Sequence, residues 1–302
     1  MNLRTLLALS LLLPAASALA ADGNFDKSFG VNGTTTLTIA TGAGYIHVYP
    51  GSDTEVHIKG HVHANRGWFG GNQDARVNEI VASPPIVQNG NTITAQSRHA
   101  DSDLFSNISI DYDITAPRSA VLKTHTGSGS IEVGGMQALV SAESGSGSIH
   151  VDNIGPNARI TTGSGHIQAG NVHGAATLQT GSGSMELQLT ASGDIKAQTG
   201  SGSIHIDGVS GGLRAGTGSG SIEVGGNLTD EWRLQTGSGN IHLHLVPEAH
   251  FTLNASAGSG TIHLKQPILA QGDINRHHIT GSVNGGGPTL RASTGSGSIT
   301  LE

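Results

Sequence analysis

The sequence has 302 residues, of which 46 are glycine, 12% are charged and 3% are aromatic. This composition is typical of a repetitive chain, while 35% hydrophobic residues are enough to form a core if they recur periodically. The formal net charge of −7 argues against non-specific binding of nucleic acid, which needs basic patches, and the absence of cysteine excludes disulfides and a reactive thiol.

The first twenty residues have the pattern of a secretory signal peptide. Arg4 gives a short positive region, residues 6–13 give an apolar region, and residues 18–20 (ALA) give a small-x-small cleavage motif. The sequence therefore predicts cleavage before Ala21 and export to the periplasm, the outer cell surface or the medium. We expect no membrane span, because the apolar run is too short to cross a bilayer and no other run is longer.

Residues 21–125 contain a first coil followed by irregular strands and a hairpin. The segment TIATGAGYIHVYPG (38–51) has two glycines in the frame of the later repeats, and EVHIKGHVHA (55–64) alternates as a strand does. The segment PIVQNGNTITA (85–95) predicts a hairpin with Asn89-Gly90 at its turn. Between them, NRGWFGGNQDA (65–75) predicts a mobile loop. We expect these pieces to form an N-terminal cap that continues into the repeats.

The remainder, residues 126–302, repeats the motif G-S-G with a nearly constant period. The first glycine of the motif falls at 127, 145, 163, 181, 200, 218, 237, 258 and 295, so most steps are 18 or 19 residues. Small or apolar residues alternate on both sides of each motif, which predicts two short strands per coil, and a fixed short period is typical of a solenoid. A further apolar residue nine positions after the glycine would close a third side of the coil; examples are Met136, Ile154, Val172 and Val209.

We therefore predict an all-β fold, a single-stranded parallel β-solenoid of about ten coils of 18–19 residues, right-handed as most parallel crossovers are. The left-handed hexapeptide helix does not fit, because it needs an aliphatic residue at every sixth position. The expected organisation is a signal peptide, 1–20, and one β-solenoid domain, 21–302, with an insertion at 265–290. Glycine suits the sharp corners, and the serine between the glycines could form a hydrogen-bonded ladder.

The chain ends in mid-repeat with GSGSITLE, where Ile299 and Leu301 occupy inward positions. An uncovered strand edge invites pairing, so two arrangements are open. Residues 266–290 could fold back as a cap, or the C-terminal strand edge could pair with a second copy or a partner strand. We favour the internal cap, because the insertion interrupts a steady period just before the last coil.

Several stretches resemble the bacterial putative-adhesin family of exported β-solenoid domains. They are the G-S-G-S-I coils, TGAGYIHVYPG, NEIVASPPIVQNGNTITAQ, ISIDYDITAP and the closing RHHITGSVNGGGPTLRASTGSGSITLE. The similarity covers nearly the whole chain after the signal peptide. It implies an exported solenoid of a family without an established function, and it supplies no catalytic residues.

Two outward columns carry the charged residues. The first, five positions after the glycine, contains acids and histidines, and the second, four positions before it, is mainly basic. Solubility explains both columns, because outward charges keep a rod from sticking to other sheets. Binding is the alternative, and its candidate residues are Glu132, His150, Glu186, His205, Glu223, His242 and His263 from the first column, and Arg159, Lys196, Arg214 and Arg233 from the second. We expect Glu132 to meet His150, and His242 to meet Glu223 or His263, one coil apart.

No cofactor, metal ion or catalytic residue is predicted. Zinc favours four tetrahedral ligands, whereas a flat ladder offers two, and HVH (61–63), HLH (242–244) and RHH (276–278) fit the general abundance of histidine. We predict a non-enzymatic, adhesin-like binding or scaffold module of the cell envelope, with a protein or surface glycan as partner. The alternative is a carbohydrate-active enzyme of the β-helix class. A groove with two carboxylates and an arginine within about 10 Å would favour the enzyme, and regular ladders would favour binding.

Overall fold

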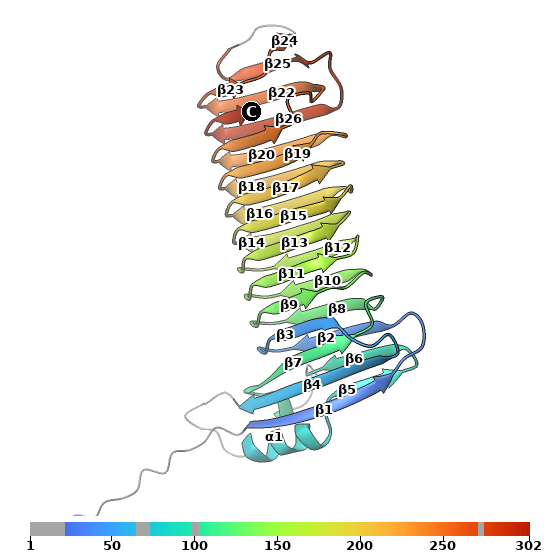
Figure 1. The fold of residues 1–302 in the computed structure, drawn as a ribbon. Coiled ribbons are helices and arrows are strands. Elements are labelled where there is room, and N and C mark those ends of the chain that lie inside the picture. Colours follow the sequence, from blue (N-terminus) through green and yellow to red (C-terminus); the bar gives the residue numbers. More distant parts are fainter. Residues whose placement is uncertain (1–21, 65–72, 98–102, 271–274) are drawn as a thin grey trace, which may run out of the picture.

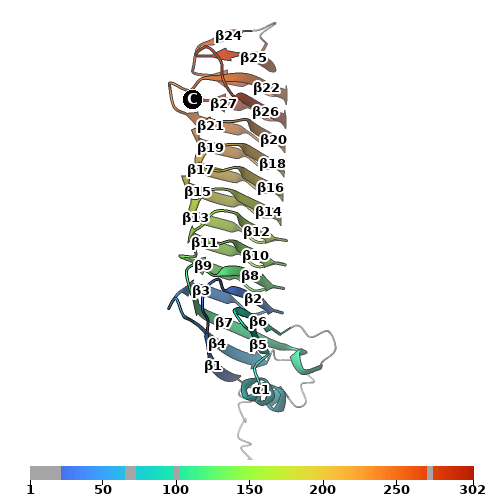
Figure 2. The same ribbon diagram turned by 90° about the vertical axis from the view of Figure 1, so that its right-hand side faces the viewer.

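The structure is a computed structural model that describes residues 22–64, 73–97, 103–270 and 275–302. The signal peptide predicted at 1–20 and most of the loop predicted at 65–75 lie outside these ranges. The described chain forms a long rod in which two sheets run side by side (Figures 1 and 2). The predicted all-β solenoid is confirmed. Within the described ranges, no helix is long and apolar enough to cross a membrane.

The two sheets, here called sheet A and sheet B, contain thirteen and fourteen strands. In spatial order, sheet A consists of β1 (Asp22–Gly30), β4 (Glu55–Ala64), β7 (Ile108–Ala116), β3 (Ile46–Pro50), β9 (Ile131–Gly134), β11 (Ile149–Ile154), β13 (Ile167–His173), β15 (Met185–Ala191), β17 (Ile204–Ser210), β19 (Ile222–Asn227), β21 (Ile241–Leu245), β27 (Ile299–Leu301) and β23 (Ile262–Leu264). Sheet B consists of β24 (Ile268–Ala270), β25 (His278–Val283), β22 (Phe251–Ser259), β26 (Thr289–Ser296), β20 (Trp232–Ser238), β18 (Leu213–Ser219), β16 (Ile195–Ser201), β14 (Ala176–Ser182), β12 (Ala158–Thr162), β10 (Val140–Ser144), β8 (Val121–Thr126), β2 (Thr36–Thr41), β6 (Thr92–Gln96) and β5 (Ile86–Asn89).

Equivalent residues of successive coils stack on one another. In sheet A, for example, Ile149 pairs in parallel register with Ile131 on one side and Ile167 on the other. The alternation of the sequence therefore sends the same positions of every coil inward, where they form one continuous core. The apolar residues of the third side, such as Met136 and Val209, are also buried.

The corner glycines are needed because backbones of neighbouring coils approach closely there. A Cβ atom added to Gly202 would lie 2.2 Å from the carbonyl oxygen of Gly183 in the preceding coil, and one added to Gly220 would lie 2.1 Å from that of Gly202. These two glycines also have φ angles of +142° and +150°, which disfavour residues with a side chain.

A buried column of hydroxyl groups joins the coils at the same corner. The residue before nearly every G-S-G motif is a threonine or serine that points inward. Its hydroxyl donates a hydrogen bond to the carbonyl of the second glycine of the preceding coil. An example is the bond from Thr217 Oγ1 to Gly202 O, at 2.9 Å. The other members are Thr126, Ser144, Thr162, Thr180, Thr199, Thr236 and Thr294, with distances of 2.8–3.1 Å. This column satisfies carbonyl groups that would otherwise be unpaired. The serines between the glycines, for which a ladder was expected, are exposed and form no side-chain bonds with one another among the described residues.

At both ends of the rod, the spatial order of the coils departs from the order of the sequence. Strands β2 and β3 lie between β6–β7 and β8–β9, and the last strands, β26 and β27, lie between β20–β21 and β22–β23 (Figure 1). Strand β27 is therefore paired on both sides, by β21 and β23. The free C-terminal strand edge, on which the possible self-association was based, is not present, because β27 has a partner strand on each side. The insertion does form a cap, since β25 pairs with β22 and β24 pairs with β25, both antiparallel, but it does not cover the last strand as expected, because β27 is covered by β23.

The N-terminal end is capped by antiparallel strands and one helix. The predicted strand 55–64 is β4, and the predicted hairpin is β5–β6, with φ +58° at Gly90. The loop prediction is wrong at its end, because residues from 73 onward begin the helix α1 (Gln73–Ala82), and a short 3-10 helix, η1, follows at Asp103–Phe105. The helix buries Val77 and Ile80 next to β1 and β4. The i, i+3, i+4 spacing of Val77, Ile80 and Val81 was a signal for this single amphipathic helix.

Candidate functional site

The acid/His column runs along the outer face of sheet A, as predicted. In spatial order it reads Asp113, His47, Glu132, His150, Gln168, Glu186, His205, Glu223, His242, Thr300 and His263. One expected neighbour pair is wrong: Thr300 of the inserted last coil separates His242 from His263. The period of the sequence placed these histidines in successive coils, but the last coil of the chain is inserted between them.

Some side chains of this column contact a register neighbour, and others contact a residue outside the column. Glu223 lies beside His242, yet its carboxylate contacts His205 Nδ1 at 3.5 Å and His244 Nε2 at 3.4 Å. His205 also contacts Asp207, at 2.9 Å. The glutamate therefore bridges its register neighbour His205 and a diagonal partner, His244, which the one-column reading of the sequence did not include.

Glu132 also interacts away from its expected partner. It accepts a hydrogen bond from the hydroxyl of Tyr49 at 2.5 Å, and this bond raises the pKa of Tyr49 to about 12. His150 instead contacts Gln168, with 3.1 Å between Nδ1 and Oε1. At the other end of the column, the hydrogen bond and positive charge of Lys265 lower the pKa of Glu302, and His244 adds to this effect. The acid/His column is therefore a set of exposed, local pairs.

The basic column runs along the outer face of sheet B. Its members stack in the order Lys123, Ser141, Arg159, Thr177, Lys196, Arg214, Arg233, Arg291 and Asn254. Lys196, Arg214, Arg233 and Arg291 come from four adjacent coils. Because adjacent strands are about 4.8 Å apart, these side chains form a dense line of positive charge. Sequence reasoning left Arg291 out of the candidate site, although it occupies the same column.

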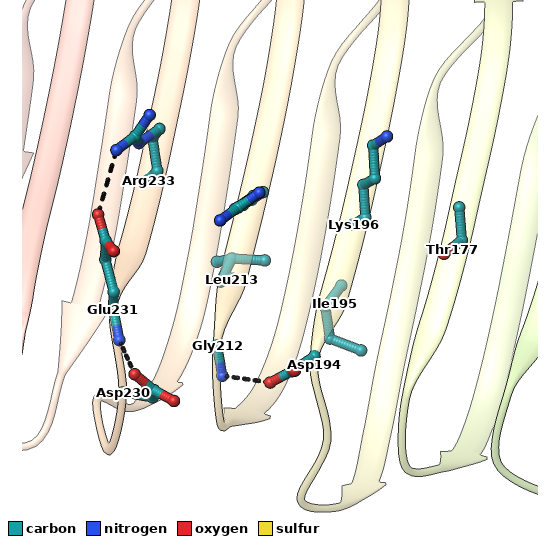
Figure 3. A pocket seen from close by; sticks show the side chains of 10 residues that line it. Thr177, Asp194, Ile195, Lys196, Gly212, Leu213, Asp230, Glu231 and Arg233 are labelled. Atoms are coloured by element: carbon teal, nitrogen blue, oxygen red, sulfur yellow. Dashed lines mark hydrogen bonds and ion pairs between the residues drawn. The ribbon is translucent and has the colours of Figure 1, made fainter.

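Hollows lie along this column, and three of them form a connected series. The largest, of about 440 Å³, is lined by Lys196, Arg214 and Arg233 together with Asp194, Asp230 and Glu231 (Figure 3). A second, of about 370 Å³, extends past Arg159 to Lys123 and shares Thr177 and Asp194 with the first. A third, of about 300 Å³, continues between Arg233 and Arg291. Together they make an extended shallow groove, here called the basic groove.

The acids of the basic groove lie at the turns before the strands, and sequence reasoning missed them. Glu231 contacts both Arg233 Nη2 and Arg291 Nε at 3.3 Å. Asp194 accepts a hydrogen bond from the backbone N–H of Gly212 at 3.2 Å, and Asp230 accepts one from that of Glu231 at 2.6 Å. An acidic residue two or three positions before the basic one was the available signal.

Two of the three cations that line the largest hollow have no acidic partner. Within the described part of the chain, Lys196 and Arg214 form no ion pair, whereas Arg233 and Arg291 share Glu231. Figure 3 shows Lys196 and Arg233 on neighbouring parts of one surface, with the acids along the edge where the strands begin. The groove can therefore offer two unpaired positive side chains to an anionic ligand.

A long rod of two parallel sheets, with residue ladders along its outer faces, defines the protein as a β-solenoid. The chain belongs to the Toastrack DUF4097 family, whose model matches residues 52–302. None of the curated proteins matches the sequence.

Solved structures with some similarity include a putative adhesin from Bacteroides fragilis. It is 12% identical, with 93% of this chain and 97% of the other covered and a TM-score of 0.36. A putative cell adhesion protein from Clostridium sporogenes is also 12% identical, with 93% and 98% covered and a TM-score of 0.25. A putative adhesin from Parabacteroides distasonis is 10% identical, with 92% and 97% covered and a TM-score of 0.26. These scores are too low to transfer a function.

Proposed function

We propose that this protein is an exported, adhesin-like binding module of the cell envelope, and that its basic groove holds an extended anionic polymer such as an acidic surface glycan. The observation that carries the proposal is the run of cations on four adjacent coils, two of them unpaired, along contiguous hollows. Export is supported by the signal-peptide pattern of residues 1–20.

The shape of the groove favours a polymer over a compact ligand. Each coil contributes one side chain to the column, so an extended chain with repeated negative charges can be contacted at several coils in succession. The strands hold these side chains at fixed spacing, so the backbone loses little freedom on binding. Affinity that depends on such charge pairs falls as salt concentration rises.

The test is to measure binding of the protein to polygalacturonate and to the neutral polymer dextran by calorimetry at two salt concentrations. We expect binding to polygalacturonate only, weakened by salt. The double change Lys196→Gln and Arg214→Gln should lower the affinity at least tenfold, because it removes the two unpaired cations of the largest hollow. As a matched control, Lys27→Gln with Lys59→Gln makes the same charge change on sheet A and should leave the affinity within about twofold. Equal binding by the groove variant and the wild type would contradict the proposal.

A second candidate function, cleavage of the same kind of polymer, is favoured by one observation. Asp194, Asp230 and Glu231 share the groove with Arg214 and Arg233, and carboxylates beside arginine were the feature expected of an enzyme. The binding function is favoured because Glu231 is paired with two arginines and the two aspartates accept backbone hydrogen bonds. Release of new reducing ends from polygalacturonate, lost in Asp194→Asn or Glu231→Gln, would instead establish the enzyme.

A further inference from the structure

The antiparallel strands at the N-terminal end bring two histidines and an aspartate together on the outer face of sheet A. Strand β4 presents His61 and His63 on one face, because alternate residues of a strand point the same way. Asp111 of β7 lies directly opposite His61 in the antiparallel register. The Nδ1 atoms of His61 and His63 are 3.7 and 3.6 Å from Oδ2 of Asp111, and the two rings stack with centroids 5.3 Å apart.

These contacts leave a buried polar atom without a partner. The Nδ1 atom of His63 is buried and forms no hydrogen bond, and the side chain of Asp111 is only 12% exposed. Buried polar atoms in folded proteins are nearly always satisfied, so an unpaired one next to a carboxylate points to a missing ligand.

The carboxylate is held in the orientation that a metal ligand needs. Oδ1 of Asp111 accepts a hydrogen bond from the backbone N–H of Tyr45 at 2.9 Å, which leaves Oδ2 facing the two histidines. A side chain at the adjacent Gly44 would meet Asp111 Oδ1 at 2.8 Å, so glycine preserves this arrangement. Second interactions of this kind fix ligating carboxylates in metal sites.

We propose that His61, His63 and Asp111 bind one divalent ion of the late first-row transition metals, of which Zn²⁺ is the representative. The three donor atoms lie within 4.8 Å of one another. Tetrahedral zinc with bonds of about 2.0–2.1 Å separates its ligand atoms by roughly 3.4 Å. The observed 3.6 and 3.7 Å therefore need to shorten by only a few tenths of an ångström.

The chemistry of the surroundings favours this class of ion. Two imidazoles and one carboxylate suit Zn²⁺, Ni²⁺ or Cu²⁺, whereas Mg²⁺ and Ca²⁺ prefer oxygen ligands. The residues opposite the histidines on the flanking strands are acidic or neutral: Asp22 and Asn24 on β1, and Ser109 on β7 beside Asp111. The side chain of His61 is 43% exposed, so a further coordination position is open to water or to a ligand.

The sequence alone predicted no metal site, because only the parallel ladder was considered. In a parallel ladder, the motif HLH at 242–244 looks equivalent to the motif HVH at 61–63. The difference arises from the antiparallel pairing of β4 with β7, which places a carboxylate oxygen between the two rings. The proposed site lies on sheet A and is independent of the basic groove on sheet B.

The experiment measures Zn²⁺ binding to the untagged, chelator-treated protein by competition with a coloured zinc chelator. We expect one Zn²⁺ per chain, not displaced by excess Ca²⁺. The double change His61→Ala with His63→Ala should lower the affinity at least tenfold. Outer partners of metal ligands typically contribute about 10- to 100-fold, and ligands should contribute no less. Asp111→Asn should also lower it at least tenfold, and this near-isosteric change keeps a side-chain oxygen for the Tyr45 N–H.

The matched control is His242→Ala with His244→Ala, which removes the other His-x-His of sheet A and should leave the zinc stoichiometry and affinity unchanged. Circular dichroism establishes that each variant is folded, and visible absorption of the Co²⁺-substituted protein reports the ligands directly. Absence of zinc binding to the wild type at millimolar concentration would overturn the proposal. So would unchanged binding by folded Asp111→Asn, or loss of binding in the His242/His244 control.

Discussion

At the scale of single residues, the repeated T-G-S-G motif is explained by the spacing between coils. The carbonyl of the second glycine is approached from the next coil by a glycine Cα and by a buried hydroxyl, as at Gly202, Gly220 and Thr217. A side chain in place of the glycine would clash, and an apolar residue in place of the threonine would leave the carbonyl unpaired. The motif therefore encodes a corner, and its serine is left free on the surface.

Changing Gly202 to alanine should lower the free energy of unfolding by about 2–4 kcal/mol, because the new Cβ would meet a backbone oxygen at 2.2 Å and the φ angle is +142°. The matched control is Gly42→Ala in the first coil, where an added Cβ has nothing within 4 Å. This control should change stability by about 0.5 kcal/mol or less. Urea denaturation of the two variants gives the comparison, and equal stability would show that the corner tolerates side chains.

At the scale of strands, the last coil joins the C-terminal cap to the body of the rod. Strand β26 pairs with β20 and β22, and β27 pairs with β21 and β23, always in parallel register. The cap formed by β22–β25 is therefore attached through the last residues of the chain (Figure 2). A coil that arrives last in the sequence fills an internal position of the stack.

Ending the chain after Gly287 should therefore cause self-association, because it removes both β26 and β27 and exposes the edges of β20 and β21. We expect a larger particle by light scattering and a lower melting temperature than for the full chain. A truncated protein with unchanged particle size and melting temperature would show that the cap closes the rod without the last coil.

At the scale of the whole molecule, the rod separates its chemistry onto two faces. Sheet A carries paired acids and histidines, and sheet B carries the basic groove, while one continuous core of inward residues stabilises both. Each internal coil contacts mainly its two neighbours, so stability is expected to be close to a sum of coil and interface contributions. A coil from the middle of the sequence should therefore be dispensable, whereas the last coil of the chain, which attaches the C-terminal cap, is not.

Deleting residues 145–162 removes one full period, with strands β11 and β12, and joins Ser144 to Gly163 in frame. We expect a folded rod, shorter by about 5 Å in small-angle scattering, with a single cooperative melting transition. It should not self-associate, in contrast to the truncation after Gly287. Unfolding or association of this deletion variant would mean that individual coils have specific partners.

The sequence by itself determined the coil, its inward positions and its hairpin, because alternation, the 18-residue period and Asn-Gly turns are local patterns. Val140, Ile149 and Leu213 lie inside for the reason that their spacing indicated. It also determined the two outward columns, although not the pairs formed within them.

Only the tertiary structure decided the order of the coils at the two ends, the partners of Glu223 and the grouping of His61, His63 and Asp111. Coils with the same inward pattern can stack on either side of one another. The repeat period therefore does not predict which two coils are neighbours in space. Helix α1 was missed because its apolar pattern is short, and the acids of the basic groove because they come from turns. The order of the coils and the grouping of His61, His63 and Asp111 depend on contacts between segments far apart in the sequence, and no local pattern records those contacts.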